Sequence, residues 1–299
     1  TPYARVAVSR SEGQVAVFVN GALAFESEGT TAEAFADIAA AQHPRPRRVL
    51  VLGGGGEGVP AALRAHAIPE IDNVEIDEQA CRLIMARAPV SRPAGRDGAG
   101  FRTIFAEPRR HLARSRPYDL ILVATGDPAS GAASRFYTRE FFLACARNLA
   151  PGGVVAVRLA ASENVWPRPL ARRTASIVNA LRAEFPDVDL VPGATLFLFA
   201  SAGPLTRDPA VLSGRLGDRG VRTRIMTPRY VRYLYENDRR DQVRRELEVL
   251  SDVEPNRDAA PSIDEVAGSE RSLRGVHADE RGVAGELGGV EVIDAQRGR

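Results

Sequence analysis

Lysine is absent from this 299-residue chain, and all 40 of its basic residues are arginine. The 38 aspartates and glutamates nearly balance them, which leaves a formal net charge of +2. Such a balance gives no general argument for a nucleic-acid partner, which would require a clear excess of positive charge. Arginine-only usage is typical of a GC-rich genome, so we attach no function to it.

Cysteine and histidine are also scarce, and their positions argue against a disulfide or a metal site. The two cysteines, Cys81 and Cys145, lie in apolar helical patterns and are predicted to be buried thiols. No metal-ligand spacing links the four histidines, which are His43, His66, His111 and His277. We therefore expect no bound metal.

Long apolar runs are missing too. None approaches the roughly 18 residues that a membrane-spanning helix needs, and no secretory signal opens the chain. Because the sequence begins at Thr1 rather than at methionine, we expect a processed or excised piece of a longer protein. The chain as written is predicted to be soluble, in the cytoplasm or as a membrane-associated domain.

What the chain does have is a glycine-rich turn, in the segment Arg48–Gly58 with the sequence RVLVLGGGGEG. The apolar run Val49–Leu52 predicts a buried parallel strand, four glycines follow it directly, and Gly58–His66 has helical composition. This order is typical of a nucleotide site, because backbone N–H groups can approach the ligand and the helix N-terminus favours anions. An acid about twenty residues later would bind ribose hydroxyls, and Glu75 stands at that distance.

After this turn, strands and helices alternate. The strands are predicted at Val49–Leu52, Val74–Ile76, Thr103–Ala106, Leu120–Val123, Val154–Arg158, Val188–Val191 and Thr195–Ala200. The helices are predicted at Gln79–Arg87, Arg109–Arg114, Thr138–Leu149 and Leu170–Phe185. Regular alternation indicates a mostly parallel sheet with helices on both faces, and the closely spaced last pair indicates an antiparallel strand. The predicted fold class is α/β, a Rossmann-like domain with a seven-stranded sheet of the class I methyltransferase type.

Composition divides the chain into four predicted regions. They are a small antiparallel β unit with a linking helix (1–42), the nucleoside-binding domain (43–203), C-terminal helices (204–250) and a mostly disordered tail (251–299). The first region contains a strong hairpin signal at Asn20-Gly21, because both central positions of a type I′ turn need positive φ. Amphipathic helices are predicted at Pro209–Leu216 and Pro228–Leu250. The tail has few large apolar groups, so burial cannot offset its ordering entropy.

Several motifs occur in the order found in spermidine synthases. HPRPRRVLVLGGGGEG resembles HP-x-P-x-RVL-x-x-GGGDG of that family, and VEID matches it without change. FAEPRRHL, YDLILVATGDP, SRFYTREFF and LAPGGVVAVR resemble further family segments. The chain thus resembles the spermidine synthase (polyamine aminopropyltransferase) family from Tyr3 to about Ala200. Its later segments IMTPRYVRYLYENDRR and EPNRDAAPS resemble bacterial members fused to membrane helices, which implies an excised soluble domain.

The resemblance implies an enzyme that moves the aminopropyl group of decarboxylated S-adenosylmethionine to a polyamine amine. It assigns the nucleoside to the backbone turn, the ribose acid and the adenine acid, which correspond to Gly53, Gly54, Gly55, Glu75 and Glu107. Glu57, next to the position of the family's ammonium-holding Asp, is the candidate to substitute for that acid. Pro108, which has no N–H to offer adenine, replaces the glycine after the family's adenine-binding Asp. Tyr137 and Trp166 are assigned to the substrate side.

The residues for the chemical step depart from the family pattern. The family's proton-accepting Asp corresponds to Ala124, and only a second acid, Asp127, remains. Gly56 replaces the Asp that holds the aminopropyl ammonium, and the run Tyr-His-Glu becomes Thr31-Ala32-Glu33. Arg158 places a cation where the family has Gln. These changes oppose polyamine binding, and losing a general base typically costs roughly 10²–10⁴-fold in rate.

Three of these residues also have a structural interpretation. Asp127 precedes Pro128, and such a pair after a strand commonly opens a turn. Tyr137 either lines the pocket or packs in the core. Trp166 follows the segment ASENV and either belongs to an active-site flap or lies in the core or at an interface.

Three functional hypotheses stay open. The first is a catalytically degenerate domain that keeps an S-adenosyl nucleoside-type pocket and acts as a scaffold or subunit. The second is an active aminopropyltransferase that converts putrescine to spermidine, with Glu57 or Asp127 replacing the missing acid. The third is a methyltransferase-like enzyme that uses S-adenosylmethionine, whose carboxylate pairs with Arg158.

The expected ligands and partners follow from the same hypotheses. No tightly bound cofactor is expected, and the candidate ligands are decarboxylated S-adenosylmethionine, S-adenosylmethionine and methylthioadenosine. The resemblance implies a homodimer, with a subunit role in a larger assembly as the alternative. Membrane association is expected only through a missing or partner segment, and no nucleic acid is expected.

Overall fold

The computed structural model describes residues 1, 3–27, 29–87, 100–128, 131–161 and 166–261. Its main sheet has seven strands in the order β6-β5-β4-β7-β8-β10-β9. The strands are β4 (Arg48–Leu52), β5 (Glu70–Glu75), β6 (Phe101–Phe105), β7 (Tyr118–Val123), β8 (Leu149–Ala160), β9 (Asp187–Val191) and β10 (Thr195–Ser201). Neighbours from β6 to β8 pair in parallel, and β10 is antiparallel to both β8 and β9. The predicted fold class is confirmed.

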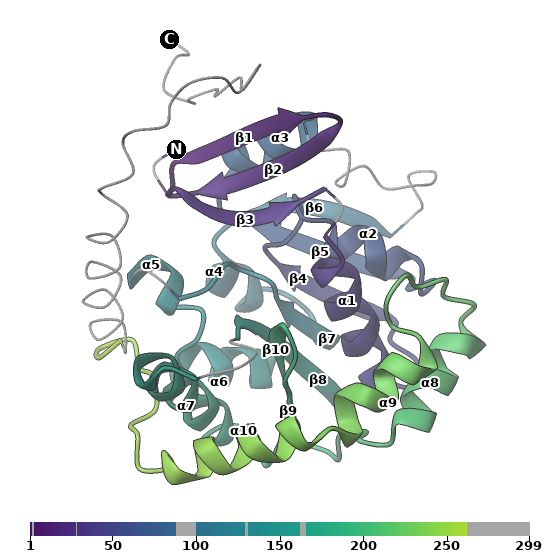
Figure 1. The fold of residues 1–299 in the computed structure, drawn as a ribbon. Helices are drawn as coiled ribbons and strands as arrows, with labels where there is room; N and C mark the ends of the chain where they lie inside the picture. The colour runs from purple at the N-terminus through teal and green to yellow at the C-terminus, as the bar shows by residue number, and fades with distance from the viewer. Residues whose placement is uncertain (2, 28, 88–99, 129–130, 162–165, 262–299) are drawn as a thin grey trace.

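Helices cover both faces of this sheet (Figure 1). They are α1 (Thr31–Gln42), α2 (Val59–Arg64), α3 (Glu78–Arg87), α4 (Pro108–Leu112), α5 (Gly131–Ser134), α6 (Arg139–Arg147), α7 (Arg168–Arg182), α8 (Pro209–Asp218), α9 (Pro228–Glu236) and α10 (Asp238–Val249). One core joins the sheet to α1, α2, α8 and α9, and the other joins it to α4, α6, α7 and α10. Along β4, Val49 and Val51 belong to the first core, whereas Leu50 and Leu52 belong to the second. Burial on both faces explains why this strand is an uninterrupted apolar run.

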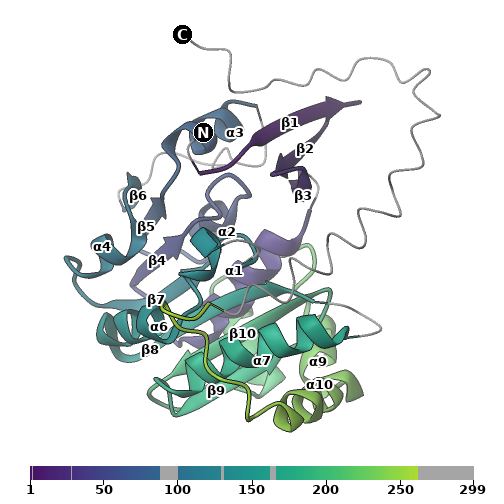
Figure 2. The same cartoon turned by 90° about the vertical axis from the view of Figure 1, so that its left-hand side faces the viewer.

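A separate three-stranded antiparallel sheet precedes the main domain, with β1 (Val6–Ser11), β2 (Gln14–Val19) and β3 (Ala22–Glu26). Figures 1 and 2 show it beside α3, at the end of the molecule opposite α10. Valines of β1 and β2 pack against Ile84 of α3. The predicted hairpin turn is confirmed, since Asn20 and Gly21 have φ of 54° and 85°.

Most element boundaries differ from the predicted ones by a few residues, and two differences are larger. The helix predicted at Pro228–Leu250 is two helices, because Asn237 is extended and its side chain accepts the Arg240 N–H to cap α10. The helix predicted at Thr138–Leu149 ends at Arg147, and β8 begins at Leu149, before the Pro-Gly-Gly sequence that was expected to precede it. Leu149 pairs with Tyr118 of β7 and Val154 pairs with Leu120, with a register shift between the two pairs, so the strand starts five residues before its predicted first residue.

The start of the region predicted as a disordered tail, residues 251–261, lies against α6 and α7. Asn256 is 1% exposed. Its backbone N–H donates to Ser176 O, and its side-chain amide donates to Tyr137 O at 3.0 Å. Residues 251–261, at the start of the tail predicted as mostly disordered, thus have defined contacts, which combine these hydrogen bonds with the packing of Val253 against the second core. Residues 262–299 lie outside the described residues.

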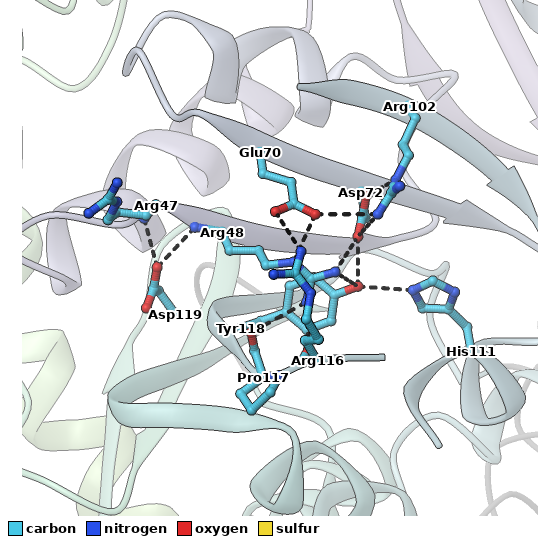
Figure 3. Close-up of polar contacts among 10 residues, drawn as sticks. All are labelled: Arg47, Arg48, Glu70, Asp72, Arg102, His111, Arg116, Pro117, Tyr118 and Asp119. Carbon is cyan, nitrogen blue, oxygen red and sulfur yellow. Dashed lines mark hydrogen bonds and ion pairs between the residues drawn. The ribbon is translucent and has the colours of Figure 1, made fainter. Parts of the chain in front are cut away.

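Charged side chains gather at the amino ends of β4, β5, β6 and β7 (Figure 3). Asp72 is fully buried and accepts hydrogen bonds from Arg48, Arg102 and the Tyr118 hydroxyl. The Arg48 guanidinium also lies 3.9 Å from the centre of the Tyr118 ring, and His111 Nε2 lies 2.9 Å from the Tyr118 hydroxyl oxygen. We call these five residues the amino-edge network. It ties four neighbouring strands and α4 together at the edge opposite the glycine turn.

The remaining predictions concern the two cysteines, metal binding and membrane-spanning helices. Cys81 and Cys145 are free and buried, as predicted. Within the described residues, no three His, Cys, Asp or Glu side chains form a group suited to a metal ion. In that same part of the chain, no helix combines the length and apolar character needed to cross a bilayer.

Candidate functional site

The glycine turn lies at the carboxyl end of β4, where the order of the sheet reverses. The chain runs outward from β4 through β5 to β6 and then returns to place β7 on the other side of β4. In open α/β sheets, ligands bind at such a switch point, outside the carboxyl ends of the strands. Gly53 and Gly54 have φ of 74° and 71°, a conformation that side chains disfavour. The turn therefore needs glycine at these positions.

Glu75, at the end of β5, is bound directly to this turn. Its Oε1 accepts the Gly55 N–H at 2.7 Å and the Asn73 side-chain amide at 3.3 Å. A Cβ added at Gly55 would lie 2.5 Å from Asn73 Nδ2 and 2.6 Å from Glu75 Oε1, so only glycine allows this approach. Burial raises the pKa of Glu75, and the two donors partly offset that effect. The sequence prediction that Glu75 lies beside the glycine turn agrees with this geometry.

Glu57 and Arg158 form a buried ion pair on the other side of the turn. Arg158 Nη1 donates to Glu57 Oε1 at 2.7 Å, and Arg158 Nη2 donates to Glu57 Oε2 and to Ala124 O. The two side chains are 12% and 13% exposed, with Glu57 the lower. Burial lowers the pKa of Arg158, but the adjacent carboxylate outweighs this effect and leaves the pKa raised. The sequence singled out both residues without predicting that they pair.

Two positions where acids are expected from the resemblance are filled by small residues in contact with the core. Ala124 is 3% exposed, and its Cβ lies only 2.8 Å from where a Gly54 Cβ would be. A Cβ at Gly56 would lie 2.8 Å from Ile84 Cγ2 of α3. An aspartate at position 56 would therefore need α3 to shift, which gives a physical reason for glycine there.

Two other acids of the predicted site are also paired with arginine. Glu33 accepts hydrogen bonds from Arg224 and from the Thr223 hydroxyl, and although burial opposes ionisation, these donors lower its pKa. Glu107 receives the Arg110 N–H at 2.8 Å as the N-cap of α4, and Arg135 Nη2 at 2.6 Å. Both oxygens of Glu107 thus already have a donor.

Asp127 and Tyr137 hold the loop that follows β7. Asp127 Oδ1 accepts the Ala160 N–H at 2.8 Å, which links this loop to the end of β8. Tyr137 is fully buried, and its hydroxyl lies 2.9 and 3.0 Å from the carbonyl oxygens of Thr125 and Gly126. In both cases the structure displays the contacts expected of a structural role.

Trp166 is half-buried against the core formed by α6, α7 and α10. Its indole Nε1 is buried without a hydrogen-bond partner among the described residues. The flap predicted from ASENV includes residues 162–165, which lie outside the described residues.

Some residues at the site were missed at the sequence level. Asn73 supports Glu75, and Arg135 and Arg224 each bind an acid that was singled out. Asn73 lies two residues before Glu75 on the same strand. Because side chains two residues apart on a strand point to the same face, the sequence could have predicted that Asn73 lies beside Glu75. Arg224 lies 191 residues from Glu33, and nothing in the local sequence indicates that contact.

The sheet order, the glycine turn and the acid at the end of β5 together define a nucleotide-binding fold of the class I methyltransferase type. The family model for the spermine/spermidine synthase domain matches residues 28–170. The chain is 30% identical over 212 residues to the polyamine aminopropyltransferase of Pyrobaculum calidifontis, covering 66% of this chain and 72% of that one. It belongs to the spermidine synthase (polyamine aminopropyltransferase) family.

Two further similarities, one to a relative and one to a solved structure, are consistent with this family assignment. Polyamine aminopropyltransferase 2 of Hyperthermus butylicus is 32% identical over 187 residues, which cover 61% of each chain, so the match spans less than two thirds of that relative. A crystal structure of spermidine synthase in complex with the transition state analogue AdoDATO superposes with a TM-score of 0.66. The superposition covers 82% of this chain and 89% of the spermidine synthase chain. Because the two sequences are 19% identical, the similarity supports the fold alone.

Proposed function

We propose that this chain binds an S-adenosyl nucleoside at the carboxyl ends of β4 and β5 and transfers a group from it to an amine, as a transferase of the aminopropyltransferase type. The contact of Gly55 with Glu75 carries the proposal. It fixes a carboxylate beside glycine backbone, which has no side chain of its own, and this is the arrangement typical of a ribose-binding acid at a nucleotide site. Family membership adds to this geometry, because the named relatives are polyamine aminopropyltransferases.

The active form of this function moves an aminopropyl group from decarboxylated S-adenosylmethionine to a polyamine such as putrescine. The names of the relatives favour it, as does the shared fold with the spermidine synthase bound to AdoDATO. The displacement needs a deprotonated amine held in line with the carbon beside the sulfonium. Asp127, which binds the Ala160 N–H, and Glu57, which pairs with Arg158, are the carboxylates on the β7–β8 side of the turn that this form would use to accept its proton.

A degenerate form, in which the nucleoside binds but no polyamine reacts, is favoured by a different observation. Glu33, Glu57 and Glu107 each form an ion pair with an arginine. An acid that is already neutralised attracts a polycation weakly, and Ala124 offers no carboxylate. In this form the chain acts as a scaffold or subunit.

Calorimetry with 5′-methylthioadenosine, followed by a putrescine turnover assay with decarboxylated S-adenosylmethionine, tests the proposal. Binding of the nucleoside is the expected result, and failure of every S-adenosyl compound to bind would contradict the proposal. Turnover above background would eliminate the degenerate form.

Ala124→Asp tests the missing acid directly. If the polyamine pocket is otherwise preserved, turnover should appear or rise by roughly 10²-fold or more, the usual contribution of a general base. Ala124→Asn, which has the same size without the charge, is the matched control. No change on restoring the acid would favour the degenerate form.

A further inference from the structure

If Glu75 on β5 binds the ribose and Glu107 after β6 lies on the adenine side, the tail of the nucleoside extends the other way, toward the Glu57–Arg158 ion pair. Glu75 is on the β5 side of the glycine turn, and the pair is on the β7–β8 side, with Glu57 only two residues after Gly55. Arg158 is anchored by the Ala124 carbonyl, and its guanidinium lies 5.7 Å from the centre of the Phe35 ring. The cation is therefore positioned by β7, α1 and Glu57 together, at the carboxyl edge of the central strands.

A buried ion pair restricts which ligands can open it. Removing one partner leaves an uncompensated charge out of water, which is far more costly than leaving the pair intact. A ligand that displaces either side chain must therefore replace the contact that it breaks. This requirement can be applied to each possible tail of an S-adenosyl compound.

A tail that carries only an ammonium group meets the requirement poorly. It can pair with Glu57, but among the described residues Arg158 would then keep the Ala124 carbonyl, at 3.2 Å, as its hydrogen-bond acceptor and would lose its ion-pair partner. The site would also gain a second positive charge close to the guanidinium, where low exposure limits screening.

A tail that carries both an ammonium and a carboxylate meets the requirement fully. Its carboxylate matches the planar, two-pronged guanidinium of Arg158, and its ammonium replaces the guanidinium on Glu57. Each buried charge keeps an opposite partner, and the net charge of the site does not change.

We propose that the Glu57–Arg158 pair selects S-adenosyl compounds that retain the amino-acid tail, with its α-ammonium and α-carboxylate, over their decarboxylated counterparts. This inference rests on the proposed nucleoside site but opposes the active form written with decarboxylated S-adenosylmethionine, because it expects a ligand with the intact amino-acid tail in its place. Arg158 is the specificity-determining residue, because it supplies the cation for the carboxylate.

Three probes that share the adenosine part separate the tail from the nucleoside. They are 5′-methylthioadenosine, which has no charged tail, S-adenosylhomocysteine, which has both charges, and S-adenosyl-3-thiopropylamine, its decarboxylated counterpart. Calorimetry on the full chain should give the lowest Kd for S-adenosylhomocysteine, by roughly ten- to a hundredfold relative to S-adenosyl-3-thiopropylamine, as expected for a hydrogen-bonded charge pair.

Arg158→Gln should remove this preference and leave the Kd of 5′-methylthioadenosine within about twofold, a difference well below one tenfold step in affinity. Arg240→Gln is the matched control. Arg240 pairs with Asp189 and is 11% exposed, close to the exposure of Arg158, but it lies on α10 at the far edge of the sheet. If Arg158→Gln does not fold, the double variant Glu57→Gln/Arg158→Gln leaves no single buried charge and should also bind the two tailed compounds equally.

The outcomes keep the two proposals apart. Failure of all three probes to bind overturns the nucleoside site itself. Binding of 5′-methylthioadenosine together with equal or tighter binding of S-adenosyl-3-thiopropylamine overturns the tail preference and leaves the nucleoside site in place. A preference for S-adenosylhomocysteine that survives Arg158→Gln also overturns the role given to Arg158.

Discussion

The two edges of the main sheet use the same ionic groups in different ways. At the amino edge, Asp72 gathers donors from several strands into one connected network (Figure 3). At the carboxyl edge, Glu33, Glu57 and Glu107 each have a separate arginine partner. A connected network must be broken as a whole, whereas separate pairs can be exchanged one at a time. The amino edge is therefore expected to stabilise the fold, and the carboxyl edge to accept a charged ligand.

Breaking the amino-edge network should have the largest effect. Asp72→Asn removes the buried carboxylate charge that Arg48, Arg102 and the Tyr118 hydroxyl share, and we expect the free energy of unfolding to fall by roughly 3 kcal/mol. Urea denaturation measures this loss. Glu70→Gln is the control, since Glu70 is 29% exposed and contacts Arg48, Arg102 and Arg116 from outside. Equal losses for the two variants would contradict the central role of Asp72.

Filling the turn at the carboxyl edge should have a smaller effect on stability and a selective effect on binding. In Gly55→Ala the new methyl group meets Asn73 and Glu75 at 2.5 and 2.6 Å, so we expect a loss of about 1–3 kcal/mol, as for other overpacked sites. Nucleoside binding should weaken as well, because Glu75 must move. Gly203→Ala has open space around its added Cβ and should change neither property. Unchanged nucleoside binding in Gly55→Ala would contradict the assigned site.

The two edges should also respond to pH in opposite directions. Burial raises the pKa of Glu75 above 4.5, so its contribution to stability is full below pH 4.5 and is lost as the pH rises through the folded value. Burial opposes ionisation of Asp72 too, but Arg102 and Tyr118 outweigh it and lower that pKa below 3.8. The Asp72 contribution is present above pH 3.8 and is lost as the pH falls through the folded value.

The free energy of unfolding, measured between pH 3 and 8, distinguishes these two opposite pH dependences. Relative to Glu75→Gln, the unsubstituted chain should lose stability as the pH rises above 4.5. The exposed substitution Glu248→Gln serves as the control and should leave the curve unchanged. The burial argument would be contradicted if the free energies of unfolding of Glu75→Gln and of the unsubstituted chain differed by the same amount at every pH.

The smallest effect is expected at the rim of the carboxyl edge. Arg135 is 41% exposed, so Arg135→Gln should cost only about 0.2–1 kcal/mol, as for other exposed ion pairs. Thermal unfolding at low and high salt measures the difference, which should shrink with salt. A loss as large as that of Asp72→Asn would remove the distinction between the two edges.

Local patterns predicted most of the fold. The buried run Val49–Leu52, the glycines after it and the hairpin at Asn20-Gly21 each specify a local conformation, and the structure contains all three. The break at Asn237 was missed because the apolar spacing continues across it, and only the cap geometry ends α9.

The candidate site could be predicted only in part. Glu75 was found because its distance from the turn along the chain follows from one strand–helix–strand unit. The partners of Glu57 and Glu33 were not, because Arg158 and Arg224 lie 101 and 191 residues away and reach them through the folded topology. Motif matching assigns a role to each acid by itself, whereas its available charge depends on such distant contacts. Pairing of two copies of the chain also stays a prediction.

Asn256 connects the far end of the described chain to the loop after β7. Its side-chain amide donates a hydrogen bond to the Tyr137 carbonyl. The hydroxyl of the same tyrosine donates to the carbonyls of Thr125 and Gly126. A truncation at residue 250 would thus remove a brace two contacts away from Ala124, although it deletes no residue of the site. A shortened chain is for this reason a poor substitute for the whole one in any measurement of ligand affinity.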